Sequence, residues 1–294
     1  MGHLLCFGLG YSAQRIAARL ASRGWKISGT TTSQDSIATL KSAGYSAALF
    51  DGENPSSEVT GLLSTASHIL LSIPPGANGD PALIHHGADI AASKSVEWIG
   101  YFSTVGVYGD AAGGWVSEDN EARPKSDRGK RRLAAEQSWQ ALGRSSAKRV
   151  DVFRLPGIYG PGRSAIEDVL GGTARRLVKP GQVFNRIHVE DIASAVIAAI
   201  DKTSVSGQIY NVTDDEPGPP QDVVAYAATL LGRTPPPEID FDTAELSPMA
   251  RSFYSESKRV SNARMKRDLL PRLAYPTYRE GLEAIAARLN QSKK

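Results

Sequence analysis

Two glycines and an alanine near the start of the chain have the spacing of a phosphate-binding turn. Gly8, Gly10 and Ala13 form the pattern G-x-G-x-x-A, directly after an apolar run over residues 4–7. The apolar side chains that follow recur at helical spacing, and they are Ala13, Ile16, Ala17 and Leu20. The pattern therefore lies where a strand turns into a helix, which is the context that a dinucleotide-binding loop requires.

Each position in this turn has a physical reason. Gly8 permits the tight turn, and Gly10 permits close approach of the backbone to a pyrophosphate. Ala13 is small enough for the helix to pack closely on the strand, and the first N–H groups of the helix would bind the phosphates. The alternative is a glycine-rich turn that binds no ligand.

The residues after the second predicted strand bear on the choice between NAD and NADP. In folds of this kind, an acidic residue about 20 positions after the glycines binds the ribose hydroxyls of NAD. This chain has Thr31, Thr32 and Ser33 there, and its first carboxylate is Asp35. Uncharged hydroxyls would tolerate a 2′-phosphate, so the sequence favours NADP and leaves NAD open. The alternative is that these residues only cap the next helix, since Ser and Thr are common N-cap residues.

These residues need a scaffold of strands and helices, and the sequence predicts one. Apolar runs typical of strands cover residues 4–7, 25–30, 47–50, 69–73, 98–103 and 151–155, with helical stretches between them. Such alternation favours right-handed βαβ units and a parallel sheet covered on both faces. A helix over 189–200 and a strand over 208–212 are expected to join the same domain. Proline clusters in the last third predict short helices joined by stiff loops.

Composition excludes several classes of protein. The net charge of +3 over 294 residues has no dominant block of one sign, so nucleic-acid binding is not expected. No apolar run approaches the roughly 20 residues that a membrane span needs. A single cysteine, Cys6, in a predicted strand fits a packed thiol in a reducing compartment, and we expect a cytoplasmic protein. His85 and His86 have no Cys or Asp at ligand spacing, so no metal site is expected.

Four further stretches carry a resemblance to a known family. They are residues 102–109 (FSTVGVYG), 154–162 (RLPGIYGPG), 188–193 (HVEDIA) and 210–212 (YNV). In this order, and together with the glycine turn, they resemble the motifs of the extended short-chain dehydrogenases/reductases, the NAD-dependent epimerase/dehydratase group. The resemblance covers most of residues 4–213.

The resemblance implies an α/β fold with a doubly wound parallel sheet of Rossmann type and a smaller C-terminal substrate-capping region. The first domain would span residues 1–160, with 183–213 joining it, and residues 161–294 would form the interleaved cap. Thr104 would occupy the catalytic Ser/Thr position and bind the oxygen of a substrate carbonyl or alcohol. Asp51 would bond the adenine amino group, and Pro156 would lie near the nicotinamide. The remaining residues expected to bind the cofactor are Gly8, Gly10, Tyr11, Ser12, Ala13, Thr31, Thr32, Ser33, Ser72, Pro74, Ser103 and Arg132.

One departure from the family pattern bears on the chemistry. The family transfers protons with a Tyr-x-x-x-Lys pair on one face of the helix after the fifth strand, and residues 110–150 contain no such pair. If the family's later glutamate corresponds to Glu136, Arg128 takes the tyrosine position and Arg132 the lysine position. Arginine does not deprotonate in proteins, so this pair would instead clamp a carboxylate or phosphate. The alternative is a solvated basic start of a helix.

Two functions follow from these expectations. The first is an NAD(P)-dependent oxidoreductase or epimerase-like enzyme of the atypical type, with NADP favoured, acting on an anionic small molecule. Tyr108 would then be the first side chain to test as proton donor, although tyrosines in such turns often only pack. The second is a non-catalytic NADP-binding sensor or regulatory protein. The helix over about 128–142 carries apolar side chains that pack on the sheet or meet a second subunit, which leaves a homodimer open.

Overall fold

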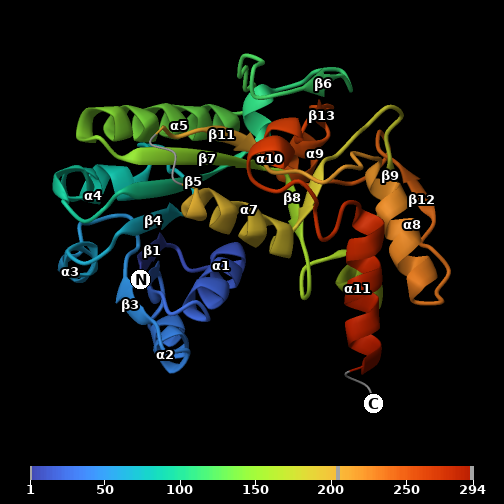
Figure 1. Ribbon diagram of the computed structural model, residues 1–294. Helices are drawn as coiled ribbons and strands as arrows, with labels where there is room; N and C mark the ends of the chain where they lie inside the picture. Colours follow the sequence, from blue (N-terminus) through green and yellow to red (C-terminus); the bar gives the residue numbers. More distant parts are fainter. Residues whose placement is uncertain (1, 203–205, 292–294) are drawn as a thin grey trace. The chain divides into compact units, whose positions relative to one another are not determined.

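The computed structural model describes residues 2–202 and 206–291, and the chain divides into two compact units (Figure 1). Unit 1 consists of Met1–Val107, Asp127–Arg154 and Ala193–Tyr210. Unit 2 consists of Tyr108–Ser126, Leu155–Ile192 and Asn211–Lys294. Each unit is described by itself below.

Unit 1 is built on a seven-stranded sheet with the strand order β11-β7-β5-β4-β1-β2-β3. The strands are β1 (His3–Phe7), β2 (Lys26–Thr31), β3 (Ser46–Leu49), β4 (His68–Leu71), β5 (Trp98–Thr104), β7 (Arg149–Leu155) and β11 (Ile209–Asn211). The pairs β1/β2, β1/β4, β2/β3 and β4/β5 are parallel. The predicted Rossmann-type parallel sheet is confirmed, and its strands lie within two residues of their expected bounds.

Helices cover both faces of this sheet because its central strands are apolar on both sides. They are α1 (Tyr11–Ala21), α2 (Gln34–Ser42), α3 (Ser57–Leu63), α4 (Pro81–Ala92), α5 (Asp127–Ser146) and α7 (Val189–Asp201). One core joins Leu5 and Phe7 of β1 to Ile90 of α4 and Trp139 of α5, all fully buried. Trp139, which the sequence left between sheet packing and a subunit interface, is therefore a core residue. Burial raises the pKa of the Cys6 thiol, which lies in β1 and is free.

Unit 2 contains three two-stranded parallel ladders and a helical core. The strands are β6 (Trp115–Val116), β8 (Gly157–Tyr159), β9 (Arg176–Val178), β10 (Arg186–His188), β12 (Glu238–Asp240) and β13 (Arg259–Val260). They pair as β8/β10, β9/β12 and β6/β13. The helices are α6 (Ala165–Leu170), α8 (Pro220–Leu230), α9 (Pro248–Phe253), α10 (Ala263–Asp268) and α11 (Tyr278–Gln291), and a 3-10 turn, η1, covers Val105–Tyr108 at the border of the two units.

Proline starts α8 and α9 of unit 2. Pro220 and Pro248 occupy the first positions of α8 and α9, where the missing N–H costs no hydrogen bond. The core of this unit joins Tyr159 of β8 to Ala227 of α8 and to Leu282 and Ile285 of α11. The residues after Pro217 thus form a small helical body around β8.

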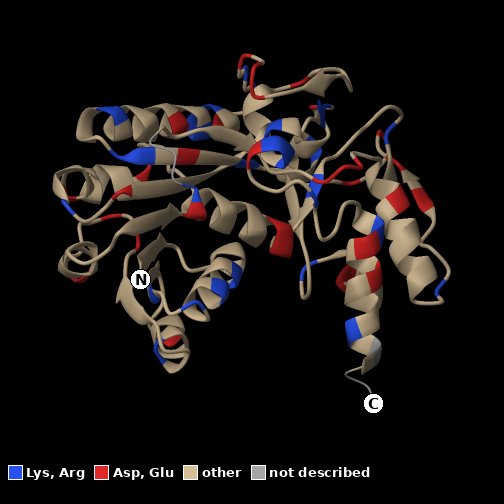
Figure 2. Ribbon diagram, viewed as in Figure 1, with Lys and Arg blue, Asp and Glu red and all other residues tan. Residues whose placement is uncertain are grey.

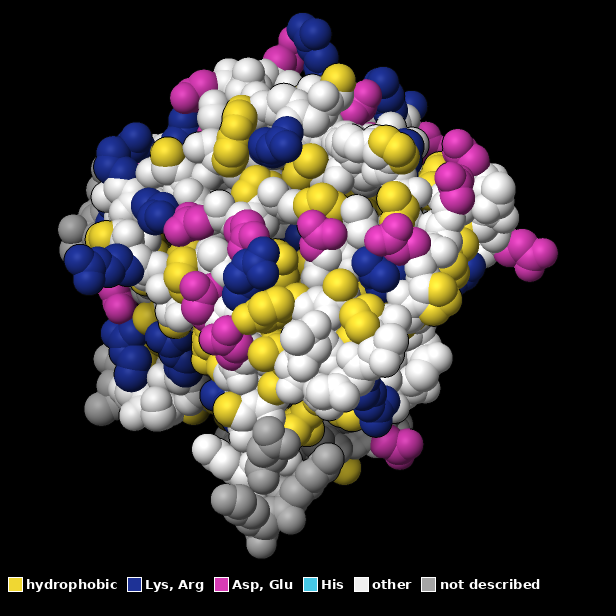
Figure 3. Space-filling view, turned by 90° about the vertical axis from the view of Figure 1, so that its right-hand side faces the viewer, with side chains coloured by type: hydrophobic (Ala, Val, Ile, Leu, Met, Phe, Trp, Pro, Cys, Tyr) yellow, Lys and Arg dark blue, Asp and Glu magenta, His cyan; other side chains and the backbone are white. Residues whose placement is uncertain are grey.

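Charges are interspersed along the chain rather than gathered by sign. Both α5 and α11 carry basic and acidic residues, and the start of α5 is mainly basic (Figure 2). The face shown in Figure 3 likewise mixes Lys and Arg with Asp and Glu between apolar side chains. Within residues 2–202 and 206–291, the structure contains no helix that is long and apolar enough to cross a membrane.

Candidate dinucleotide site and catalytic residues

The turn between β1 and α1 has the backbone geometry that requires glycine at position 8. Gly8 has φ +84°, and a Cβ atom there would lie 2.6 Å from Cγ2 of Ile73. A side chain at this position would therefore combine left-handed backbone strain with a steric clash. The tight turn predicted at Gly8 is present.

Gly10 has a different role, because it borders open space. It is the N-cap residue of α1, no side chain caps the helix there, and a Cβ atom would meet nothing within 4 Å. The first turn of α1 contains Tyr11, Ser12 and Ala13 and no acidic residue. The uncapped N–H groups and the positive end of the helix dipole are suited to an anionic ligand.

A cavity of about 360 Å³ lies next to this turn, within unit 1. Its lining residues are Gly8, Leu9, Gly10, Gln14, Thr30, Thr31, Thr32, Ser36, Thr39, Leu40, Phe50 and Ile73. None of them carries a charge. The lining combines glycine backbone, hydroxyl groups and apolar side chains, which suit the pyrophosphate, the ribose and the adenine of a dinucleotide.

Three polar side chains hold the glycine turn in place. The N–H of Gly8 donates to Oγ1 of Thr30 at 2.9 Å, and Nε2 of Gln14 donates to the carbonyl of Leu9 at 3.1 Å. The hydroxyl of Ser72 donates to the carbonyl of Gly8. Ser72 was expected to line the cofactor; in the structure it holds the turn and is not among the residues that line the cavity, and its contact with a cofactor stays a prediction. Thr30 and Gln14 were not singled out from the sequence.

The hydroxyl residues after β2 separate into two groups. Thr31 and Thr32 line the cavity, together with Ser36 and Thr39 of α2. Ser33 is the N-cap of α2, and its Oγ accepts a hydrogen bond from the N–H of Ser36 at 3.2 Å. Helix capping, the alternative weighed for this stretch, is therefore the role of Ser33 in this structure. Ser36 and Thr39 add hydroxyls that the sequence pattern did not reveal.

Three other expected cofactor residues lie outside the lining of this cavity. Asp51 is exposed, and its Oδ1 accepts a hydrogen bond from the N–H of Glu53 at 2.8 Å. Pro74 is exposed in the loop after β4. Ser103 is buried in β5, where its hydroxyl donates to Glu136.

Glu136 is the centre of a buried polar cluster. Its carboxylate accepts two hydrogen bonds from Arg154, at 3.1 Å from Nε and 2.7 Å from Nη2. Ser103, Glu136 and Arg154 are each at most 5% exposed. Two guanidinium donors of Arg154 and the hydroxyl of Ser103 thus supply the hydrogen bonds that the buried carboxylate needs. These contacts fix α5 against β5 and β7. Arg154 is the first residue of one of the four family-like motifs, but the sequence does not reveal its partner.

Arg128 and Arg132 lie one helical turn apart at the start of α5. Nη1 of Arg132 donates to the carbonyl of Phe102 and, at 3.4 Å, to the hydroxyl of Tyr101. Arg128 is exposed, and partial desolvation together with the positive charge of Arg132 lowers its pKa. The structure therefore brings the two cations together and anchors Arg132 at the end of β5. Burial raises the pKa of Tyr101, which makes this phenol a poor proton donor at neutral pH.

Thr104 ends β5, and its Oγ1 accepts a hydrogen bond from the N–H of Gly106 at 3.1 Å. This contact orients the hydroxyl. In the part of the chain that the structure describes, no acceptor is found for the Thr104 proton, which can therefore be donated to a substrate oxygen.

Tyr108 belongs to unit 2 and has a hydrogen-bonded neighbour there. Its hydroxyl donates to Oδ1 of Asn211 at 2.8 Å, and the N–H of Asn211 donates to Oε1 of Glu118 at 2.7 Å. Tyr108 is 5% exposed and Asn211 is fully buried. Glu118 and Asn211 are thus positioning residues for the phenol.

Tyr159, which ends β8, packs on the C-terminal helix α11. Its hydroxyl donates to the carbonyl of Thr277 at 3.2 Å, and a Cβ atom at Gly281 would lie 2.1 Å from that hydroxyl. Burial raises the pKa of Tyr159. Pro156 lies in the connection between β7 and β8. Among the described residues, no group of three or more His, Cys, Asp or Glu side chains is arranged to hold a metal ion.

Comparisons with known proteins place this geometry in a family. The model of the NAD dependent epimerase/dehydratase family matches residues 88–213. Protein YeeZ of Escherichia coli strain K12 is 30% identical over 240 residues, which cover 78% of this chain and 84% of that protein.

Two solved structures extend the comparison to the whole fold. A functionally unknown conserved protein from Silicibacter pomeroyi DSS is 48% identical, with a TM-score of 0.90 and coverage of 98% of this chain and 99% of that chain. UDP-glucuronic acid 4-epimerase from Bacillus cereus, in complex with UDP-glucuronic acid and NAD, is 16% identical, with a TM-score of 0.77 and 99% of both chains covered. At that identity the likeness shows the fold alone. The match to YeeZ, the family model and the parallel sheet with its glycine turn agree, and the chain belongs to the NAD-dependent epimerase/dehydratase family.

Proposed function

We propose that this protein is an NADP-preferring oxidoreductase or epimerase-like enzyme that acts on an anionic small molecule. The observation that carries the cofactor part is the uncharged cavity beside Gly10, with hydroxyls of Thr31, Thr32, Ser36 and Thr39 in its lining. A carboxylate at this place would repel a 2′-phosphate, and none lines the cavity.

The chain supplies groups that suit hydride-transfer chemistry. A bound nicotinamide cofactor would donate or accept the hydride. Thr104 would bind the substrate oxygen through its hydroxyl, whose position the N–H of Gly106 fixes. Arg128 would bind the anionic group of the substrate and would stay charged throughout, so it would orient the substrate without transferring a proton. Tyr108, held by Asn211, is the side chain we propose as proton donor.

A non-catalytic NADP-binding sensor is the second candidate, and one observation favours it. If the family's glutamate corresponds to Glu136, its tyrosine and lysine positions hold Arg128 and Arg132, and Arg132 already donates to the carbonyl of Phe102. The nearby Tyr101 is fully buried. A protein with this arrangement could bind the cofactor and report on it without turnover.

A substrate screen separates the two candidates. Phosphorylated and carboxylated carbonyl compounds are mixed with NADPH and the protein, and loss of NADPH absorbance is followed. An enzyme turns over at least one anionic compound, and Thr104→Val and Tyr108→Phe then reduce its kcat while NADPH still binds. NADPH binding without turnover of any compound supports the sensor. A neutral sugar as the best substrate contradicts the anionic substrate class.

A further inference from the structure

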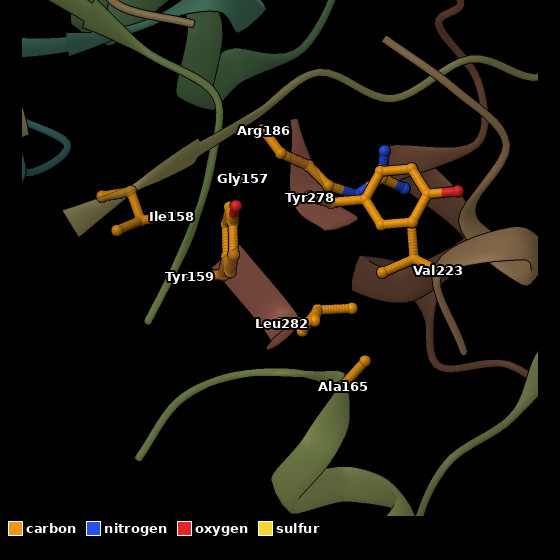
Figure 4. A pocket seen from close by; sticks show the side chains of 8 residues that line it. All are labelled: Gly157, Ile158, Tyr159, Ala165, Arg186, Val223, Tyr278 and Leu282. Atoms are coloured by element: carbon orange, nitrogen blue, oxygen red, sulfur yellow. The ribbon is translucent and has the colours of Figure 1, made fainter. Parts of the chain in front are cut away.

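Unit 2 contains a cavity of its own, of about 190 Å³. Its lining residues are Gly157, Ile158, Tyr159, Ala165, Arg186, Val223, Tyr278 and Leu282 (Figure 4). The side chains of Tyr159, Leu282, Ala165 and Val223 surround the open centre in Figure 4, and Arg186 lies at the Tyr278 end. Nothing in the proposed function uses this cavity, which is called the Arg186 pocket below.

The size of the Arg186 pocket limits what it can hold. An engineered protein cavity of about 150 Å³ binds benzene, whereas pockets for drug-sized ligands start at about 300 Å³. At about 190 Å³ the pocket matches a single ring with one small substituent. A nucleoside diphosphate is too large to be enclosed here.

Arg186 is the only charged residue in this lining, and protein carbonyls orient it. Its Nη1 donates to the carbonyls of Phe184 and Gly218, both at 3.2 Å. Its Cζ lies 5.7 Å from the centroid of the Tyr278 ring. Within residues 2–202 and 206–291, no carboxylate forms an ion pair with it, and burial lowers its pKa. The guanidinium is thus held in place by two carbonyls and an aromatic ring, with no carboxylate of the described residues at ion-pair distance.

The acidic residues near Arg186 form no ion pair with it in the described part of the chain. Burial raises the pKa of Asp214 to about 8, and among the described residues no hydrogen-bond partner is found for its Oδ2. Glu216 forms its ion pair with Arg279, at 3.1 Å. A partly desolvated guanidinium beside an apolar cavity is stabilised by an anion that enters from solvent.

We propose that the Arg186 pocket binds a small carboxylate that carries one apolar ring. The carboxylate accepts hydrogen bonds from the Arg186 guanidinium, and the ring packs between Tyr159, Tyr278 and Leu282. The site lies entirely in unit 2 and contains no residue of the glycine turn. Its occupancy can therefore be measured without NADPH, and its failure would leave the proposed cofactor site untouched.

Benzoate is the probe, titrated into the full chain and followed by calorimetry. We expect saturable binding of one benzoate at millimolar concentration, and at least about tenfold weaker binding of neutral benzamide, because a hydrogen bond to a charged group contributes more than a neutral one. Arg186→Leu should abolish benzoate binding. Arg233→Leu is the matched control, since that guanidinium also donates to a carbonyl, that of Val169 at 2.8 Å, but is exposed outside the pocket.

A second variant keeps the test valid if Arg186→Leu does not fold. Ala165→Leu leaves Arg186 in place and fills the cavity from α6, so it should also abolish benzoate binding while thermal melting stays cooperative. Equal affinity of Ala165→Leu and the wild type for benzoate would overturn the proposal. The absence of saturable benzoate binding to the wild type, or equal affinity for benzoate and benzamide, would overturn it as well.

Discussion

The N–H of Gly8 donates to the hydroxyl of Thr30 at 2.9 Å, across two neighbouring strands of the sheet. Gly8 stands at the end of β1 and Thr30 within β2, and Thr30 is 1% exposed. The bond satisfies a backbone donor that the left-handed turn removes from the β-ladder. The shape of the candidate dinucleotide site thus depends on a threonine from the neighbouring strand.

Replacing Thr30 by Val should therefore distort the turn without changing side-chain volume. The partly buried N–H of Gly8 would lose its partner, at a cost of about 1 kcal/mol in the free energy of unfolding. We expect NADPH affinity to fall about tenfold, equivalent to about 1.4 kcal/mol. Urea unfolding and fluorescence titration measure the two effects. Thr30→Ser keeps the hydroxyl and serves as the control; if it behaves like Thr30→Val, the hydrogen bond is not the cause.

Thr31→Asp should shift the cofactor preference toward NADH. The new carboxylate would repel a 2′-phosphate and accept hydrogen bonds from a free ribose diol. Ser33→Asp places the same charge two residues away, at a cap position that favours Asp and lies outside the cavity lining. Paired dissociation constants for NADPH and NADH should change their ratio only in Thr31→Asp. An unchanged ratio would mean that the phosphate does not bind at Thr31.

The two arginines of α5 should respond differently to replacement by Leu. Arg132→Leu removes the donor to the Phe102 carbonyl and the Tyr101 hydroxyl, and should lower the free energy of unfolding by about 1–3 kcal/mol. Arg128 is exposed, so Arg128→Leu should change the free energy of unfolding by no more than about 0.5 kcal/mol. It should weaken the binding of an anionic substrate. Arg132→Leu should also weaken the binding of NADPH, because the family resemblance places this position at the nicotinamide ribose. Equal loss of NADPH affinity in both variants would make Arg128 a cofactor residue.

The raised pKa of Asp214 predicts that the stability of the folded protein falls as the pH rises. A carboxyl group with a lowered pKa would have the opposite effect. The folded-state pKa of Asp214 is raised from 3.8 to about 8 by burial, so the folded protein holds a proton that the unfolded chain releases. The stability that this proton contributes is complete below about pH 4 and is lost as the pH rises to about 8.

Asp214→Asn should remove this contribution, because an amide does not titrate. We expect the variant to be more stable than the wild type at pH 8 and nearly equal to it at pH 4. Chemical denaturation at the two pH values measures the difference. Asp242→Asn, at an exposed position, is the control. A wild type that loses no stability relative to Asp214→Asn between these pH values would disprove the raised pKa.

The sequence predicted those features that depend on residues close to one another along the chain. The glycine turn, the strand ends and the capping capacity of Ser33 all follow from residues within one turn or strand. It did not predict contacts that depend on how the strands and helices pack. Thr30 reaches Gly8 only because β1 and β2 pair in register, with Cys6 opposite Gly29. Arg154 meets Glu136 from a different element, and Tyr108 meets Asn211 across 103 residues of chain.

NADPH binding to a Gly10→Leu variant tests the central claim most directly. Gly10 has space for a side chain and a backbone conformation that any residue can adopt, so the variant should fold like the wild type. Its new side chain would occupy the space beside the first turn of α1 in which we place the pyrophosphate. Gly61→Leu, a matched change in α3 that also meets open space, is the control. We predict that the wild type and Gly61→Leu bind NADPH more tightly than NADH and that a folded Gly10→Leu binds neither. Unchanged NADPH affinity in Gly10→Leu, or no binding of either nucleotide by the wild type at millimolar concentration, would contradict the account.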